Sequence, residues 1–202
     1  MPKANDFELA PDEIVAAAVE IFLEQGLDAV SMRSVAARLG VSPAPLYSRV
    51  GNKDALVDAI ADHLLSDLAP PHADDEPWTD YAMRWALELR TRLRRAHDSR
   101  LILVTDRDAY VEASRPLVSV MRASGFAADA AVQACRLVMW ATVGFVAMET
   151  AAKAPPARAT RRGRSGSNPH GVTPEDADEL FSLQIRYVID GIARDAQGAQ
   201  GD

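Results

Sequence analysis

The sequence predicts an all-α fold, with an N-terminal three-helix helix-turn-helix domain followed by a longer helical domain. The 202 residues are 48% hydrophobic and 25% charged, which is typical of a globular chain long enough for one or two domains. The 11 glycines and 12 prolines fall mostly between long segments in which apolar residues recur every three or four positions. Two short segments of this kind are joined by Gly40, Val41 and Ser42, which is the arrangement of a helix-turn-helix motif.

The first two helices are marked by residues at their ends. We expect a helix over about 11–25, because a proline and two acids suit its first turn and Gly26 follows the last periodic residue. Ser31 offers an N-cap to a second helix over 32–39. Ser34 stands where a full capping box has Glu or Gln, so we expect an incomplete box.

The third and fourth helices complete the first domain, which we expect to span 1–68. Ser42 is expected to cap a helix over about 43–50, in which Pro43 suits the first position. A fourth helix is expected over 54–68, because leucine or isoleucine recurs there every four residues.

The second domain, 69–202, is predicted to contain longer helices. Pro116 is expected to bend or restart one of them. Residues 153–171 combine five bases and no acid with Pro, Gly, Ser and Asn, a composition that predicts a mobile loop. Both a solvated linker and a nonspecific phosphate-binding segment fit this loop. The expected helices cover about 78–96, 109–123, 127–152 and 174–196.

Charge is unevenly distributed along the chain. The net charge of −7, taken alone, disfavours a nucleic-acid partner, because phosphate binding requires local positive charge. Residues 31–53 depart from this average, since they contain Arg33, Arg38, Arg49 and Lys53 and no acid. Charge alone leaves phosphate contacts and a solvated helical surface as alternatives, and for Arg38 we expect the solvated position.

The stretch 31–56 carries a family resemblance. It reads SMRSVAARLGVSPAPLYSRVGNKDAL, with a Val-Ala pair, Leu-Gly-Val-Ser across the turn, Leu-Tyr in the third helix, and Asn-Lys and Ala-Leu at the fourth. This string resembles the signature of the tetracycline-repressor (TetR) family of bacterial transcriptional regulators. The resemblance is close over about 10–68 and looser beyond. It implies a ligand-responsive regulator, most often a repressor, that binds a palindromic double-stranded DNA operator as a homodimer.

The resemblance also indicates which residues meet DNA. Tyr47 and Lys53 match phosphate-contacting positions of the family, although Tyr47 could instead be a core aromatic. The third helix begins with small side chains, which suits a major groove about 12 Å wide. Pro45 departs from the family by placing a stiff ring where relatives approach bases, so we expect readout through thymine methyl groups, Ser48 and Arg49. The expected DNA-binding residues are Arg33, Ser42, Pro43, Ala44, Pro45, Tyr47, Ser48, Arg49 and Lys53.

In the family the C-terminal helices form an effector pocket, and the last two helices pair with those of a second subunit. We expect a small, largely apolar effector, because Met and aromatic side chains adapt to such ligands. Each of these residues could instead fill the core, and the two histidines could lie at the surface. The expected pocket residues are His63, Trp85, Leu89, His97, Thr105, Met121, Phe126, Met139, Trp140, Phe145 and Met148.

Segments 97–107 and 144–149 weakly resemble the tetracycline-binding repressors themselves. Too few of the magnesium- and drug-binding residues match for tetracycline to be predicted.

Other classes of protein are disfavoured. No catalytic constellation or metal-ligand cluster stands out, so we predict no enzyme, no cofactor and no metal site. The single Cys135 and the absence of a secretion signal favour the cytoplasm, and the uncharged run 137–148 is too short to cross a membrane. The alternative is a helical interaction protein of the same fold that has lost operator binding, which Pro45 and the acidic surroundings keep open.

Overall fold

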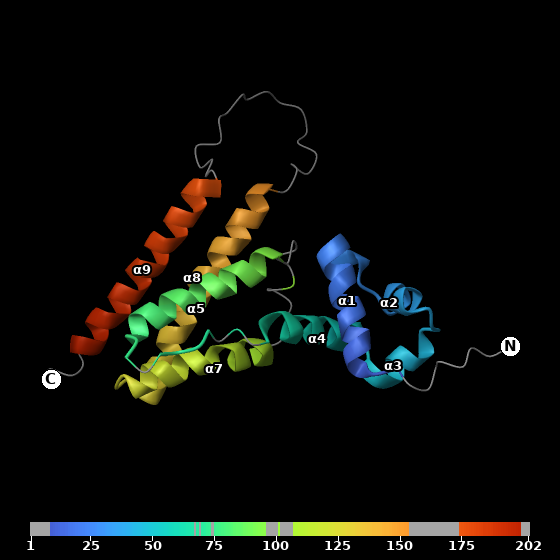
Figure 1. Cartoon of the computed structure of the whole chain (residues 1–202), viewed down its shortest axis with the longest axis horizontal. Coiled ribbons are helices and arrows are strands. Elements are labelled where there is room, and N and C mark those ends of the chain that lie inside the picture. Colours follow the sequence, from blue (N-terminus) through green and yellow to red (C-terminus); the bar gives the residue numbers. More distant parts are fainter. Residues whose placement is uncertain are drawn as a thin grey trace, which may run out of the picture. The chain divides into compact units, whose positions relative to one another are not determined.

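The computed structural model describes residues 9–66, 68, 70–73, 75–95, 101, 107–153 and 174–198. Every regular element among these residues is helical, which confirms the predicted all-α class (Figure 1). Contacts divide the chain into two compact units. One comprises Met1–Ala69 and Thr91–Arg115, and the other Pro70–Arg90 and Pro116–Asp202. The domain boundary expected after residue 68 stays a prediction.

Helix α1 (Pro11–Gln25) is the centre of the first unit. It contacts α2 (Met32–Leu39), α3 (Ala44–Val50) and α4 (Lys53–Leu65), the helices drawn in blue to teal in Figure 1. A short 3-10 turn, Leu27–Ala29, connects α1 to α2. Removing apolar side chains from water drives this packing. The fully buried side chains that join the four helices are Ile14, Phe22, Val35, Leu46, Leu56 and Ile60.

Both ends of α2 are where the sequence predicts them. The Ser31 hydroxyl oxygen accepts a hydrogen bond from the Ser34 amide at 3.1 Å, and the Ser34 hydroxyl oxygen accepts one from the Ser31 amide at 2.9 Å. The capping box is therefore complete, with serine in the role usually taken by Glu or Gln, which corrects the expectation of an incomplete box. Gly40 closes the helix at φ 69°, in the left-handed region that favours glycine.

The start of α3 differs from the prediction. Its N-cap is Pro43 rather than Ser42, and no side chain caps the helix. An N-cap side chain accepts from the second or third residue of the helix, and counted from Ser42 the third is Pro45, which has no N–H, so only the Ala44 amide could donate to such a cap. In the structure the Leu46 amide donates to the Pro43 carbonyl at 3.2 Å.

Helix α4 begins one residue earlier than expected and ends three residues sooner. Asn52 caps it, because its Oδ1 accepts from the Ala55 amide at 2.8 Å. The helix ends at Leu65, and the Ser66 amide donates to the Asp62 carbonyl.

The second unit is built mainly from α8 (Ala128–Lys153) and α9 (Pro174–Gly198), which lie against each other. Helix α5 (Trp78–Arg95) supplies its residues up to Arg90 to this unit, and α7 (Arg107–Ala123) supplies those from Pro116 onward. Helix α7 continues through Pro116 and does not restart there, and the alternative of a bend at Pro116 stays a prediction. The buried side chains of this unit include Tyr81, Trp85, Leu89, Leu117, Met121, Val138, Val146, Phe181 and Ile185.

Helix α8 is long and apolar. Among the residues that the structure describes, Ala128–Thr150 is the one stretch long and apolar enough to cross a membrane by length and composition. Core helices of soluble proteins meet the same criterion, and α8 packs along α9. The mobile loop predicted over 153–171 lies outside the described residues, apart from Lys153 at the end of α8.

Candidate nucleic-acid interface

Helix α3 presents most of its residues to solvent. Within this helix, all of whose residues are described, Leu46 alone is buried and anchors it to the core. Ala44, Tyr47 and Ser48 are exposed and share one face, because residues three and four apart are neighbours on a helix. Tyr47 is 55% exposed, so it is not a core aromatic. The side chains at the start of this face are small, so the helix is narrow enough to enter a major groove.

The two prolines and Ser48 shape the first turn of this face. Pro43 and Pro45 are half-buried, and the missing N–H of Pro45 falls where an α-helix has no internal acceptor for it. The Ser48 hydroxyl donates to the Pro45 carbonyl at 2.8 Å. Its oxygen lone pairs then face outward as acceptors, while its proton is used within the helix.

Cations and a further hydroxyl flank α3. Arg33 is exposed on α2, Arg49 is exposed in the last turn of α3, and Lys53 is exposed at the start of α4. Ser42 is exposed in the turn and makes no cap, which leaves its hydroxyl accessible from outside the domain. These side chains come from three helices of the first unit and from the turn between two of them.

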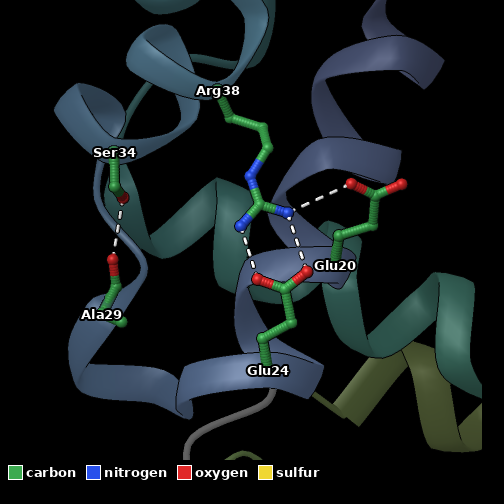
Figure 2. A network of polar contacts seen from close by, with 5 residues as sticks. All are labelled: Glu20, Glu24, Ala29, Ser34 and Arg38. Carbon is green, nitrogen blue, oxygen red and sulfur yellow. Dashed lines mark hydrogen bonds and ion pairs between the residues drawn. The ribbon is translucent and has the colours of Figure 1, made fainter.

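Arg38 takes part in a network of ion pairs with α1. Its guanidinium bonds both carboxylate oxygens of Glu24, at 3.1 and 2.6 Å, and one oxygen of Glu20, at 3.2 Å (Figure 2). The hydrogen bond from Arg38 lowers the pKa of the Glu24 carboxyl below its ordinary value, and the same bond raises the pKa of Arg38. Arg38 is exposed, as expected, and its guanidinium is in addition held by these ion pairs.

The residues expected around an effector are dispersed. His63 is exposed on α4 in the first unit, and His97 and Thr105 lie outside the described residues. Trp140 and Met148 on α8 are 64% and 75% exposed, so the described residues form no cavity that encloses them. Trp85, Leu89 and Met121 are buried, whereas Phe126, Met139 and Phe145 are half-buried.

One surface hollow of about 520 Å³ lies in the second unit. It is lined by α9 side chains and includes none of the residues expected around an effector. The pocket assignment therefore stays a prediction.

A buried charged cluster in the second unit was not predicted from the sequence. Arg90 of α5 donates to both oxygens of Glu149 on α8, at 3.1 and 3.3 Å, and lies 2.8 Å from an oxygen of Asp178 on α9. Its guanidinium also faces the rings of Phe181 and Phe145, at 4.6 and 5.3 Å from their centroids. The Arg90 and Glu149 side chains are only 5% and 9% exposed. We call this group the Arg90 cluster.

The sequence did contain a signal for the cluster. Arg90 continues the apolar stripe of α5, where Ala82 and Ala86 are buried at spacings of four, and Glu149 ends the apolar run of α8. A charge at a position that the helical period assigns to the core is expected to have a charged partner.

The first unit defines a helix-turn-helix DNA-binding domain, joined in one chain to a second helical unit. A profile described as "Bacterial regulatory proteins, tetR family" matches residues 14–60, from α1 to α4. The tetracycline repressor protein class A from transposon 1721 of Escherichia coli is 28% identical, over 93% of this chain and 92% of that protein. The class G repressor of Vibrio anguillarum is 27% identical, over 90% and 92%.

Solved structures that carry TetR names also resemble this chain. The chain resembles a single-substitution variant of TetR from Acinetobacter baumannii AYE in complex with minocycline, with a TM-score of 0.75, 27% identity, and 93% and 98% of the two chains covered. A possible TetR family regulator from Streptomyces coelicolor A3(2) gives 0.76 and 26%, with 91% and 98% covered. The chain belongs to the TetR family and is a transcriptional regulator. Regulators of this family are typically non-enzymatic, soluble DNA-binding proteins that respond to ligands and act as dimers.

Proposed function

We propose that this protein is a repressor that binds a palindromic operator as a homodimer and is released by a small, largely apolar effector. The observation that carries the proposal is the exposed face of α3, held by the buried Leu46 and flanked by exposed cations. A surface of this kind suits a helix that enters a major groove while neighbouring side chains contact the phosphates on either side.

The exposed side chains divide between positioning and sequence readout. Tyr47, Arg33 and Lys53 would contact phosphates, which fix the position of the domain on the duplex. Ala44 and Pro45 would meet thymine methyl groups. Because the Ser48 proton is held by the Pro45 carbonyl, Ser48 would act as an acceptor towards the exocyclic amine of adenine or cytosine.

Ser42, Pro43 and Arg49 complete the proposed interface. The exposed Ser42 hydroxyl would meet a phosphate at the turn, with the half-buried Pro43 packed beside the backbone. Arg49 would contact a phosphate or the O6 and N7 acceptors of a guanine.

Dimerisation is supported by the second unit. Large apolar side chains remain exposed along α8 and α9, and such surfaces on a soluble protein mark interaction sites. One recognition helix covers only half of a site, so a two-fold dimer supplies the second helix about one turn of DNA away. The exposed side chains concerned are Val132, Leu137, Trp140, Met148, Leu180, Leu183 and Tyr187.

Release by an effector requires that the ligand bind one conformation of the regulator better than the other. The apolar side chains of the second unit, Trp85, Leu89 and Met121 among them, would surround such a ligand once the unit opens around it. Similarity to repressors named for tetracycline, and to a structure in complex with minocycline, makes this drug class the first to test.

The proposal can be tested by selection from a random duplex library at about 0.1 M salt. At this concentration salt screens the nonspecific attraction to phosphates, so sequence-specific contacts dominate the binding. Wild-type protein should enrich a palindrome, and a Tyr47→Ala, Lys53→Ala double variant should not. Addition of minocycline to the wild-type complex then tests the effector class. Failure of the wild type to enrich any sequence across a salt series would overturn operator binding by the unliganded protein.

A further inference from the structure

We propose that Arg38 is a positioning residue that holds the helix-turn-helix in its DNA-binding orientation and does not itself contact phosphate. The inference rests on the proposed operator binding and extends it. It separates the four cations of residues 31–53 into three that are proposed to face DNA and one whose guanidinium is bound by two glutamates of α1.

The guanidinium of Arg38 is bound by two carboxylates. Both terminal nitrogens bond Glu24, and one of them also reaches Glu20. The two glutamates lie one turn apart on α1, so they form a two-pronged acceptor for a planar guanidinium. Exposed ion pairs usually contribute little, but bidentate arginine contacts within a network are the exception. The Arg38 side chain is only 29% exposed, compared with 64% and 54% for the glutamates.

The position of Arg38 explains why this contact matters for DNA. Arg38 lies in the last turn of α2, immediately before the turn that leads to α3. Helix α3 has seven residues and buries one of them, so its orientation depends on α2 and α1, which it contacts. A contact that fixes the end of α2 against α1 therefore also fixes the direction in which α3 is presented.

A second polar contact holds the opposite end of α2. The Ser34 hydroxyl donates to the Ala29 carbonyl at 2.7 Å, which ties the first turn of α2 to the preceding 3-10 turn (Figure 2). Helix α2 is thus fixed at its start by Ser34 and at its end by Arg38. The buried Val35 and Ala36 lie between the two contacts, and the buried Met32 lies at the start of the helix.

The arrangement makes a numerical prediction about salt. Each phosphate contact that releases counterions contributes about 0.9 to the slope of log affinity against log salt concentration. If Arg49 contacts a phosphate, the three cations Arg33, Arg49 and Lys53 in each subunit of a dimer give a slope of about −5. If Arg38 also reached a phosphate, the slope would be about −7.

The test uses the full-length protein, the operator duplex obtained by selection and a scrambled duplex of equal length, with affinities measured by fluorescence anisotropy over a salt series. Arg38→Gln should weaken operator binding about fivefold or more, in line with loss of a networked pair in both subunits, and leave the slope unchanged. Binding to the scrambled duplex should stay the same, because it depends on phosphate contacts alone. A residue that merely stabilises the fold would lower the melting temperature without changing the ratio of the two affinities.

The change in operator affinity caused by Glu24→Gln has opposite signs for the two possible roles of Arg38, positioning and phosphate contact. If Arg38 is a positioning residue, this variant weakens operator binding even though it makes the protein more positive. If Arg38 reaches phosphate, removal of its acidic partner strengthens binding and steepens the slope, which would overturn the inference. Asp12→Asn, which removes an exposed acid elsewhere on α1, is the matched control for the change in charge.

Arg33→Gln calibrates the salt measurement. Arg33 is exposed on the same helix and is proposed to contact phosphate, so its loss should reduce the magnitude of the slope by about 2 per dimer. A reduction of this size for Arg38→Gln would refute the positioning role while leaving operator binding intact. Absence of operator binding by the wild type would instead refute the proposed function on which the inference rests.

Discussion

Removal of Arg90 is predicted to destabilise the second unit more than removal of either of its acidic partners. Arg90→Met takes away the guanidinium and leaves the Glu149 carboxylate, 9% exposed, without that partner. Breaking a buried ion pair from one side costs about 3–5 kcal/mol. Loss of the contacts with the Phe181 and Phe145 rings adds to this cost, because a desolvated cation over an aromatic face contributes about 2 kcal/mol.

The free-energy cost of replacing each acidic partner of Arg90 should be smaller the more exposed its side chain is. Glu149→Gln keeps the shape of the side chain but weakens two charged hydrogen bonds, for an expected cost of about 2–3 kcal/mol. Asp178→Asn should cost about 1 kcal/mol or less, because the Asp178 side chain is 65% exposed and water screens its attraction to Arg90.

Urea unfolding monitored by circular dichroism, at one fixed protein concentration, measures these free energies per subunit. An Arg90→Met, Glu149→Met double variant is the decisive comparison. Replacing both members of a buried pair by apolar groups is often nearly neutral, so the double variant should be more stable than Arg90→Met alone. Equal costs for Arg90→Met and Asp178→Asn, or simple additivity in the double variant, would refute the argument that burial determines the ranking.

Three further predictions concern α4, the dimer and pH. Asn52→Ala should lower the free energy of unfolding by about 1 kcal/mol, because the Ala55 amide loses its cap; urea unfolding checks this, and an unchanged midpoint would contradict it. Trp140→Glu should convert the dimer to a monomer in sedimentation experiments, since a charge would replace an exposed ring on the proposed interface, whereas Val111→Glu on α7 should remain dimeric. Because Arg38 lowers the pKa of Glu24 in the folded chain, its contribution to stability is present above the ordinary value of 4.5 and is lost as the pH falls through the lowered value. Glu24→Gln should therefore flatten the acid side of a stability profile measured between about pH 5 and 2, and an unaltered profile would disprove this linkage.

Local signals in the sequence were sufficient to predict most of the helix-turn-helix. The bounds of α1 and α2 follow from an apolar period and from Ser31 and Gly40, which act on residues within one turn. The failure at Ser42 was also local. Of the two residues that could donate to a cap at Ser42, Pro45 has no N–H, and α3 begins without a side-chain cap.

Long-range partners could not be predicted in the same way. Arg38 finds Glu24 and Glu20 at sequence separations of 14 and 18, and Arg90 finds Glu149 at a separation of 59. Such pairs depend on how helices cross, which the helical period does not encode. A pocket face and a subunit face on α8 could not be separated from the sequence either, because a helix that is apolar on most sides carries no directional pattern. Trp140 and Met148 were expected in the pocket for that reason, yet they are exposed.

Sequence-specific binding through the exposed face of α3 is tested by titrating the selected palindrome and a scrambled duplex with wild-type protein and with the Tyr47→Ala, Lys53→Ala double variant. We expect two subunits per palindrome, a clear preference over the scrambled sequence, and a loss of affinity of about a hundredfold or more in the variant. Equal affinity of the variant and the wild type, or equal affinity of the wild type for both duplexes, would contradict this mode of binding.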